Sequence, residues 1–157
     1  MSREIERKFL LRNTDWKHGV VGERFCQGYA DAKSGTFRVR IAGENAWLTI
    51  KTHVRGCSRL EFEYGIPVDD ALQLLENVCE KPYIVKTRYK VEYEGMVWEI
   101  DEFEGENAGL TLAEIELESE DQPFSLPGWI GMEVTHDPRY YNSRLAVNPY
   151  SSWKDRP

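Results

Sequence analysis

The sequence has few of the features that most readily reveal a fold or an activity. Its three cysteines, Cys26, Cys57 and Cys79, form an odd set without C-x-x-C spacing, which argues against a disulfide framework and a structural zinc site. No segment approaches the roughly 20 consecutive apolar residues of a membrane span. The N-terminal residues are charged where a secretory signal would be apolar. We therefore expect a cytoplasmic protein without a membrane partner.

Positive charge is also scarce in this chain. Lys and Arg total 20 against 27 for Asp and Glu, which gives a net charge of −7. An acidic chain of this kind is a poor default partner for nucleic acids and anionic membranes, so we expect neither. The 157 residues are one domain's worth of polypeptide, and 41% of them are hydrophobic, enough for a core without disulfides. We expect a single domain over residues 1–157.

Helical periodicity is limited to two segments, 69–80 and 138–146. Residues 122–131 are rich in proline and glycine and predict a surface loop, and residues 133–135 predict one more strand or a lid segment. Most of the remaining chain alternates apolar and polar residues with period two, which is typical of β-strands. This alternation predicts eight strands, at residues 3–11, 23–30, 36–42, 46–52, 59–66, 84–93, 96–103 and 112–118.

Eight strands joined by short turns are typical of a small closed barrel. Turn-forming residues at 33–35, 42–45 and 94–95 predict hairpins, and hairpins pair strands antiparallel. We therefore expect a mainly β (α+β) fold, in which a closed eight-stranded antiparallel barrel forms a tunnel and a few short helices lie outside it.

One face of nearly every predicted strand is ionic. Like charges recur two residues apart on single strands, as in Arg38 and Arg40, where they repel each other. Either this face is solvated on a one-sided sheet, or the sheet closes around an ionic interior. The repetition of same-sign pairs, with Arg preferred among the cations, favours the ionic interior, because a ligand could relieve the repulsion. Phosphate groups suit the cations and Mg²⁺ or Mn²⁺ suits the carboxylates, so the pattern predicts a phosphate-rich ligand with bound metal.

The ordered set of charged residues resembles the CYTH or triphosphate tunnel metalloenzyme superfamily, in its small bacterial, tripolyphosphatase-like type. The N-terminal signature Glu-x-Glu-x-Lys of that superfamily matches Glu4, Glu6 and Lys8. The resemblance covers nearly all of residues 3–146 and implies an eight-stranded antiparallel tunnel that processes a triphosphate with Mg²⁺ or Mn²⁺. The other matching positions are Gln27-Gly28-Tyr29, Arg38, Arg40, Lys51, Arg59, Glu61, Glu63, Lys86, Arg88, Glu99, Asp101, Glu114 and Glu116.

The resemblance also implies roles for these residues. Lys8 and Tyr29 would position the attacking water, and Lys51 or Arg59 would neutralise the departing pyrophosphate. The cations expected to bind the phosphates are Lys8, Arg38, Arg40, Lys51, Arg59, Lys86 and Arg88. The acids expected at the metal are Glu4, Glu6 and Glu116, with Glu61, Glu63, Asp101 and Glu114 for a second ion or its water shell. Some acids, among them Glu61, Glu63 and Glu99, could instead only orient Arg and Lys side chains.

The function implied by the resemblance is a divalent-metal-dependent hydrolase. It would cleave the terminal phosphoanhydride of a small anionic triphosphate, first of all inorganic tripolyphosphate, to pyrophosphate and phosphate. The enzymatic alternatives are a nucleoside or thiamine triphosphatase and a class IV adenylyl cyclase acting on ATP. A polyphosphate or nucleotide sensor is the non-enzymatic alternative, although a pure binder would not need the metal-binding acids. The oligomeric state stays open, with a homodimer as one option.

Overall fold

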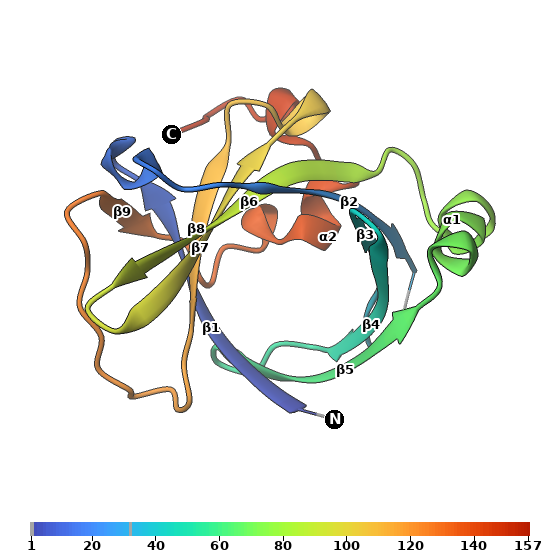
Figure 1. The fold of residues 1–157 in the computed structure, drawn as a ribbon, viewed down its shortest axis with the longest axis horizontal. Helices are drawn as coiled ribbons and strands as arrows, with labels where there is room; N and C mark the ends of the chain where they lie inside the picture. The colour runs from blue at the N-terminus through green and yellow to red at the C-terminus, as the bar shows by residue number, and fades with distance from the viewer. Residues whose placement is uncertain (1, 32) are drawn as a thin grey trace.

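The chain folds into a closed antiparallel β-barrel (Figure 1). The computed structural model describes residues 2–31 and 33–157. The strands follow the order β5-β4-β3-β2-β6-β7-β8-β1-β9, and a further pairing of β1 with β5 closes the ring. All eight predicted strands are confirmed. They are β1 (Ser2–Leu11), β2 (Glu23–Ala30), β3 (Gly35–Ala42), β4 (Asn45–Thr52), β5 (Ser58–Ile66), β6 (Ile84–Tyr93), β7 (Met96–Phe103) and β8 (Thr111–Glu116).

A ninth strand, β9 (Ile130–Glu133), pairs antiparallel with β1 outside the ring. It begins inside the segment predicted as a loop over 122–131, so that loop ends at Trp129. The prediction of a strand or lid at 133–135 is placed three residues too late, because only Glu133 belongs to the strand. Val134 still donates a backbone hydrogen bond to the Lys8 carbonyl at 2.8 Å, which keeps this segment against β1.

The two predicted helices are shorter than their sequence patterns. Helix α1 (Val68–Asn77) ends where the backbone amides of Val78 and Cys79 both donate hydrogen bonds to the Leu74 carbonyl. The predicted helix over 138–146 is split into a 3₁₀ turn (Pro138–Tyr140) and α2 (Asn142–Leu145), because Tyr141 has an extended backbone. Further 3₁₀ turns lie at Asp15–Lys17, Gly105–Asn107 and Tyr150–Ser152. No helix within the described residues is long and apolar enough to cross a membrane.

Much of the hydrophobic core lies outside the barrel wall. Helix α1 packs its buried Ala71 and Leu75 against Val39 on the outer face of β3. It approaches β2 so closely that a Cβ atom on Gly28 would lie 2.7 Å from Leu75, which explains the glycine of the Gln-Gly-Tyr motif. The loop before β9 covers Trp98 with the Phe124 ring. The outward apolar faces are thus buried without filling the barrel interior.

The C-terminal segment closes one end of the barrel. Its buried residues Tyr140, Leu145 and Trp153 pack with Ile84 and Leu112. Ile84 and Leu112 occupy the same strand faces as Lys86 and Glu114, two residues away, and those faces point into the barrel. Figure 1 accordingly shows α2 within the outline of the ring. Only α1 therefore lies on the outer wall as predicted, whereas the segment that carries α2 packs across a barrel end.

Candidate active site in the barrel interior

The ionic strand faces point into the barrel. A cavity of about 270 Å³ in the interior is lined by every acidic and basic residue predicted at the site except Asp101, and by Tyr29. This arrangement contradicts the solvated one-sided sheet and confirms the closed sheet around an ionic interior. Within the cavity, the acidic residues of β1 and β8 lie across the ring from the arginines of β3.

The acidic wall consists of Glu6, Glu99, Glu114 and Glu116 on β1, β7 and β8. Strand register places Glu6 beside Glu116, and Glu114 beside Glu99. Burial, Glu114 and Glu4 raise the pKa of Glu6 to about 8. Burial, Glu4 and Glu61 also raise the pKa of Glu116, which forms no ion pair with the described residues. This wall therefore gathers more carboxyl groups than the nearby cations can keep ionised, and a bound metal cation would favour their ionised forms.

The cationic wall consists of Arg38, Arg40, Lys86 and Arg88 on β3 and β6. Burial and the neighbouring cations Arg38 and Arg88 lower the pKa of Arg40 to about 9. Among residues 2–31 and 33–157, no acidic side chain forms a salt bridge with Arg40. The Nε atom of Arg38 is buried and has no hydrogen-bond partner in the same part of the chain. This wall has a surplus of positive charge and an unused donor, both suited to a phosphate anion.

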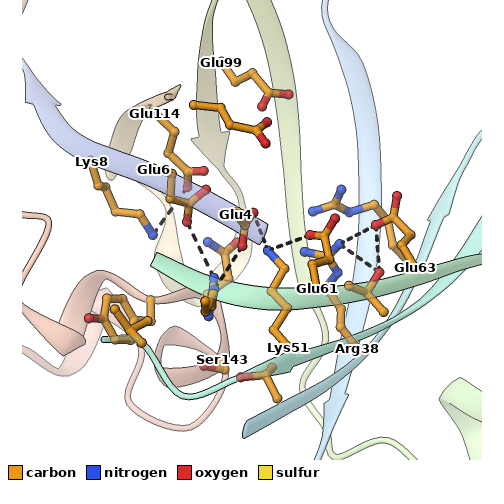
Figure 2. Close-up of a pocket in the computed structure, with 18 of the residues that line it drawn as sticks. Glu4, Glu6, Lys8, Arg38, Lys51, Glu61, Glu63, Glu99, Glu114 and Ser143 are labelled. Carbon is orange, nitrogen blue, oxygen red and sulfur yellow. Dashed lines mark hydrogen bonds and ion pairs between the residues drawn. The ribbon is translucent and has the colours of Figure 1, made fainter. Parts of the chain in front are cut away.

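A third group of residues, on β1, β4 and β5, is internally paired. Glu4 accepts hydrogen bonds from Lys51 Nζ at 2.8 Å and from Arg59 Nε at 3.0 Å. Burial opposes ionisation of Glu4, but Lys51 and Arg59 outweigh it and lower the pKa of Glu4. Figure 2 shows Lys51 between Glu4 and Glu61, whose carboxylate lies 3.4 Å from Lys51 Nζ. The signs of charge alternate here, so this group needs no ligand for balance.

Asp101 contacts cations and is not among the residues that line the cavity, so its place at the metal stays a prediction. It is 1% exposed. Its carboxylate accepts hydrogen bonds from Lys86 Nζ at 2.7 Å and from Arg88 Nε and Nη2 at 2.7 and 2.9 Å. Burial opposes its ionisation, but Arg88 and Lys86 outweigh that effect and hold the pKa of Asp101 well below its ordinary value.

Glu63 and Glu99 also contact cations, which was one of the roles left open for them. Glu63 accepts a hydrogen bond from the Thr49 hydroxyl at 2.9 Å and lies 3.5 Å from Arg38 Nη2. Glu99 accepts one from Arg88 Nη1 at 3.1 Å. Both nevertheless line the cavity, so their carboxylates also face the space where a ligand would lie.

Lys8 and Tyr29 line the same cavity but have different partners. Lys8 Nζ donates to the Tyr140 carbonyl at 3.2 Å, and lies 3.4 Å from Glu114 and 5.5 Å from the centre of the Tyr141 ring. Burial would lower the pKa of Lys8, but Glu114 and Glu6 outweigh it and raise that pKa. The Tyr29 hydroxyl accepts a hydrogen bond from Gln27 at 2.7 Å. The contacts of Lys8 therefore run to the C-terminal segment.

Apart from Tyr29, the sequence pattern did not identify the uncharged residues of the site. Thr36 and Thr49 share strand faces with Arg38 and Lys51, so the period-two alternation could have identified them. The contribution of the C-terminal segment had no comparable signal, because it follows from the way this segment packs across the barrel end. Figure 2 shows Ser143 of that segment beside the cavity. The residues it adds to the lining are Thr135, Tyr141, Asn142 and Ser143.

The acidic wall has the chemistry of a divalent-cation site. Carboxylate oxygens are hard ligands suited to Mg²⁺ or Mn²⁺, and a cation near Glu6 and Glu116 would relieve their repulsion. Within residues 2–31 and 33–157, no three acidic, histidine or cysteine side chains already form a complete metal site. Mg²⁺ commonly combines one or two carboxylates with water and phosphate oxygens, so the residues present fit this ion without a closed protein cage.

Comparison with known proteins places this site in a family. The inorganic triphosphatase of Acetivibrio thermocellus is 49% identical over 156 residues, which cover 99% of this chain and 100% of that protein. The inorganic triphosphatase of Nitrosomonas europaea is 37% identical over 151 residues, covering 92% and 97%. The crystal structure of the inorganic triphosphatase NE1496 superposes with a TM-score of 0.67, at 35% identity and with 94% and 96% of the chains covered. The CYTH domain model matches residues 2–141, and the chain therefore belongs to the CYTH domain family.

Proposed function

We propose that this chain is a divalent-metal-dependent triphosphatase that hydrolyses inorganic tripolyphosphate to pyrophosphate and phosphate. The observation that carries the proposal is the separation of charge inside the barrel. Among the described residues, Arg40 on the cationic wall and Glu116 on the acidic wall form no ion pair. Burial and neighbouring carboxylates raise the pKa of Glu6 to about 8, and a bound metal cation would favour its ionised form. A triphosphate with a bound divalent cation supplies both missing charges at once. Two relatives that match more than nine-tenths of this chain are named inorganic triphosphatases.

The cations of the cavity would bind the phosphates of the substrate. Four cations on one side of the cavity supply hydrogen-bond donors, namely Arg38, Arg40, Lys86 and Arg88. The guanidinium groups are planar and pair well with phosphate oxygens, and the lysine ammonium group acts as a point charge. Phosphoryl transfer spreads negative charge over the oxygens of the transferred group. Catalysis therefore depends mainly on positioning and on electrostatic stabilisation by groups already in place.

The remaining cations would act on the attacking water and the leaving group. Water attacks the terminal phosphorus, the bond to the bridging oxygen breaks, and pyrophosphate departs with its added negative charge. Lys51 and Arg59, which donate hydrogen bonds to Glu4, would neutralise that charge by donating to the product as well. Lys8, with Tyr29 on the same cavity surface, would hold the water in line for attack.

Glu4, Glu6 and Glu116 would hold the divalent cation, with Glu61, Glu63 and Glu114 near enough on the cavity surface to serve a second ion or its waters. A bound Mg²⁺ or Mn²⁺ lowers the pKa of coordinated water and neutralises phosphate charge. Asp101 is left out of this set, because it is 1% exposed and does not line the cavity.

The test is phosphate release from tripolyphosphate, ATP and thiamine triphosphate, each with Mg²⁺, Mn²⁺ or a chelator. We expect release from tripolyphosphate with metal and none with the chelator. No release from any substrate with either metal would contradict the proposal and favour a sensor, whereas formation of cyclic AMP and pyrophosphate from ATP would favour a cyclase. We also propose that residues 1–157 work as one domain, since the family match spans 2–141 and the later residues pack against the barrel.

A further inference from the structure

Two uncharged side chains, Gln27 and Asn142, contact the cationic wall. Gln27 lies on β2 and is fully buried. Its Oε1 atom accepts a hydrogen bond from Arg40 Nε at 2.8 Å, and its Nε2 atom donates to the Tyr29 hydroxyl at 2.7 Å. Gln27 therefore fixes the guanidinium group of Arg40 from behind the cavity surface, without bringing a negative charge to it.

Asn142 extends this contact to Lys86. It is the first residue of α2 and lies one position beyond the family match, which ends at residue 141. Its Oδ1 atom accepts hydrogen bonds from Lys86 Nζ at 2.9 Å and from Gln27 Nε2 at 3.4 Å. The C-terminal segment is thus joined to Lys86 directly and to Arg40 through Gln27.

Neutral acceptors differ from carboxylates in their effect on a bound cation. Lys51 and Arg59 are both held by Glu4, whose charge competes with an incoming phosphate for the same donors. An amide oxygen orients a cation with a hydrogen bond but leaves its net charge available. Arg40 has an amide in place of a carboxylate, and Lys86 has one amide and one carboxylate, that of Asp101.

We propose that Gln27 and Asn142 are positioning residues of the substrate site. Gln27 holds Arg40, and Asn142 supports Lys86 beside Asp101, through neutral acceptors that add no further negative charge to the cationic wall. This inference rests on the proposed function, because it assumes that a polyphosphate anion enters the cavity. Through Asn142, the start of α2 becomes a part of the substrate site. The proposed role of Asn142 is its contact with Lys86, a cation expected to bind the substrate.

The test compares Asn142→Asp with Asn142→Ala. The matched control is Asn13→Asp, which adds the same charge at an exposed position where the side chain accepts a backbone hydrogen bond that a carboxylate can also accept. Binding of tripolyphosphate is measured by calorimetry in chelator, and kcat and KM by phosphate release with Mg²⁺. We expect Asn142→Asp to weaken binding and raise KM about tenfold or more, Asn142→Ala to change them about threefold, and the control to leave them unchanged.

A purely structural role for Asn142 predicts a different pattern. In that case Ala would lower affinity as much as Asp does, or Asp would bind tripolyphosphate as tightly as wild type, and either result would overturn the inference. Thermal unfolding confirms that each variant is folded, and Gln27→Glu repeats the charge test at Arg40 if Asn142→Asp does not fold. Failure of the wild-type protein to bind or hydrolyse tripolyphosphate would instead overturn the proposed function, and this inference with it.

Discussion

The acidic and cationic walls of the cavity meet at one ion pair, Arg88 with Glu99 at 3.1 Å, yet Glu116 and Arg40 form no ion pair with the described residues. Burial and like charges raise the pKa of Glu6 to about 8 on one side and lower the pKa of Arg40 to about 9 on the other. Between them, Glu4 and Glu61 form ion pairs with Lys51 and Arg59, so the two signs of charge are balanced. The difference teaches that charged residues inside a barrel can be arranged in two ways. They can pair with each other, or they can be kept apart for a ligand that carries both signs of charge.

The largest effect is expected from removing surplus positive charge. Arg40→Ala should lower kcat/KM for tripolyphosphate about 10²–10³-fold, because it removes a preorganised cation from the transferred phosphate group. Arg139→Ala is the control, since Arg139 pairs with Asp137 on the surface at 2.8 Å and such pairs contribute little. Steady-state phosphate release measures both variants. An Arg40→Ala enzyme within threefold of wild type would show that the cationic wall is not the phosphate site.

A somewhat smaller effect is expected from the opposite wall. Glu6→Gln keeps the shape of the side chain but removes its charge, and should raise the metal concentration needed for half-maximal activity about 10–100-fold. The control is Glu76→Gln. Glu76 lies on α1 and forms an exposed ion pair with Lys81. Metal titration of activity at saturating tripolyphosphate separates this result from substrate binding. Equal metal requirements for wild type and Glu6→Gln would remove Glu6 from the proposed ligand set.

The same residue predicts how stability depends on pH in chelator. The folded-state pKa of Glu6 is raised from 4.5 to about 8, so between these values the folded protein retains a proton that the unfolded chain has lost. Its contribution to stability is therefore complete at low pH and is lost as the pH rises through about 8. The difference in unfolding free energy between wild type and Glu6→Gln should change by up to about 1.4 kcal/mol per pH unit in this range. Denaturant unfolding at pH 6, 7 and 8 measures it, and a flat difference would contradict the assigned shift.

The smallest effect is expected from a neutral contact of the cationic wall. Thr49 is fully buried, accepts a hydrogen bond from Arg38 at 3.1 Å and donates one to Glu63 at 2.9 Å. Thr49→Val keeps the side-chain volume and should lower tripolyphosphate affinity only about two- to fivefold. A change of that size corresponds to the net contribution of at most one hydrogen bond. Calorimetry in chelator measures it, and Thr52→Val on the same strand is the control. A loss of affinity larger than that caused by Arg40→Ala would show that orienting Arg38 matters more than the charge of Arg40.

Period-two alternation predicted the barrel because closure turns one face of every strand inward. The placement of Glu4, Lys51 and Arg40 in one cavity follows from that rule alone. The contacts of Asp101 could not be predicted in the same way. The alternation places its side chain on the inward face of β7, but its burial depends on contacts with Lys86 and Arg88 on the neighbouring strand. Asn142 was missed for another reason. Its position depends on how a C-terminal segment with an extended Tyr141 packs across the barrel end, and no local pattern encodes that packing.

The closure of the ring through β1 has a consequence for how this protein is made. Glu4 pairs with Arg59 in β5, and Glu6 pairs with Glu116 in β8, so the first strand synthesised completes its ladder only after the last strand of the ring has left the ribosome. Such distant contacts slow folding. The acids of β1 and β8 come to lie across from the arginines of β3 only in the finished ring, so a nascent chain should have no partial activity at any earlier length.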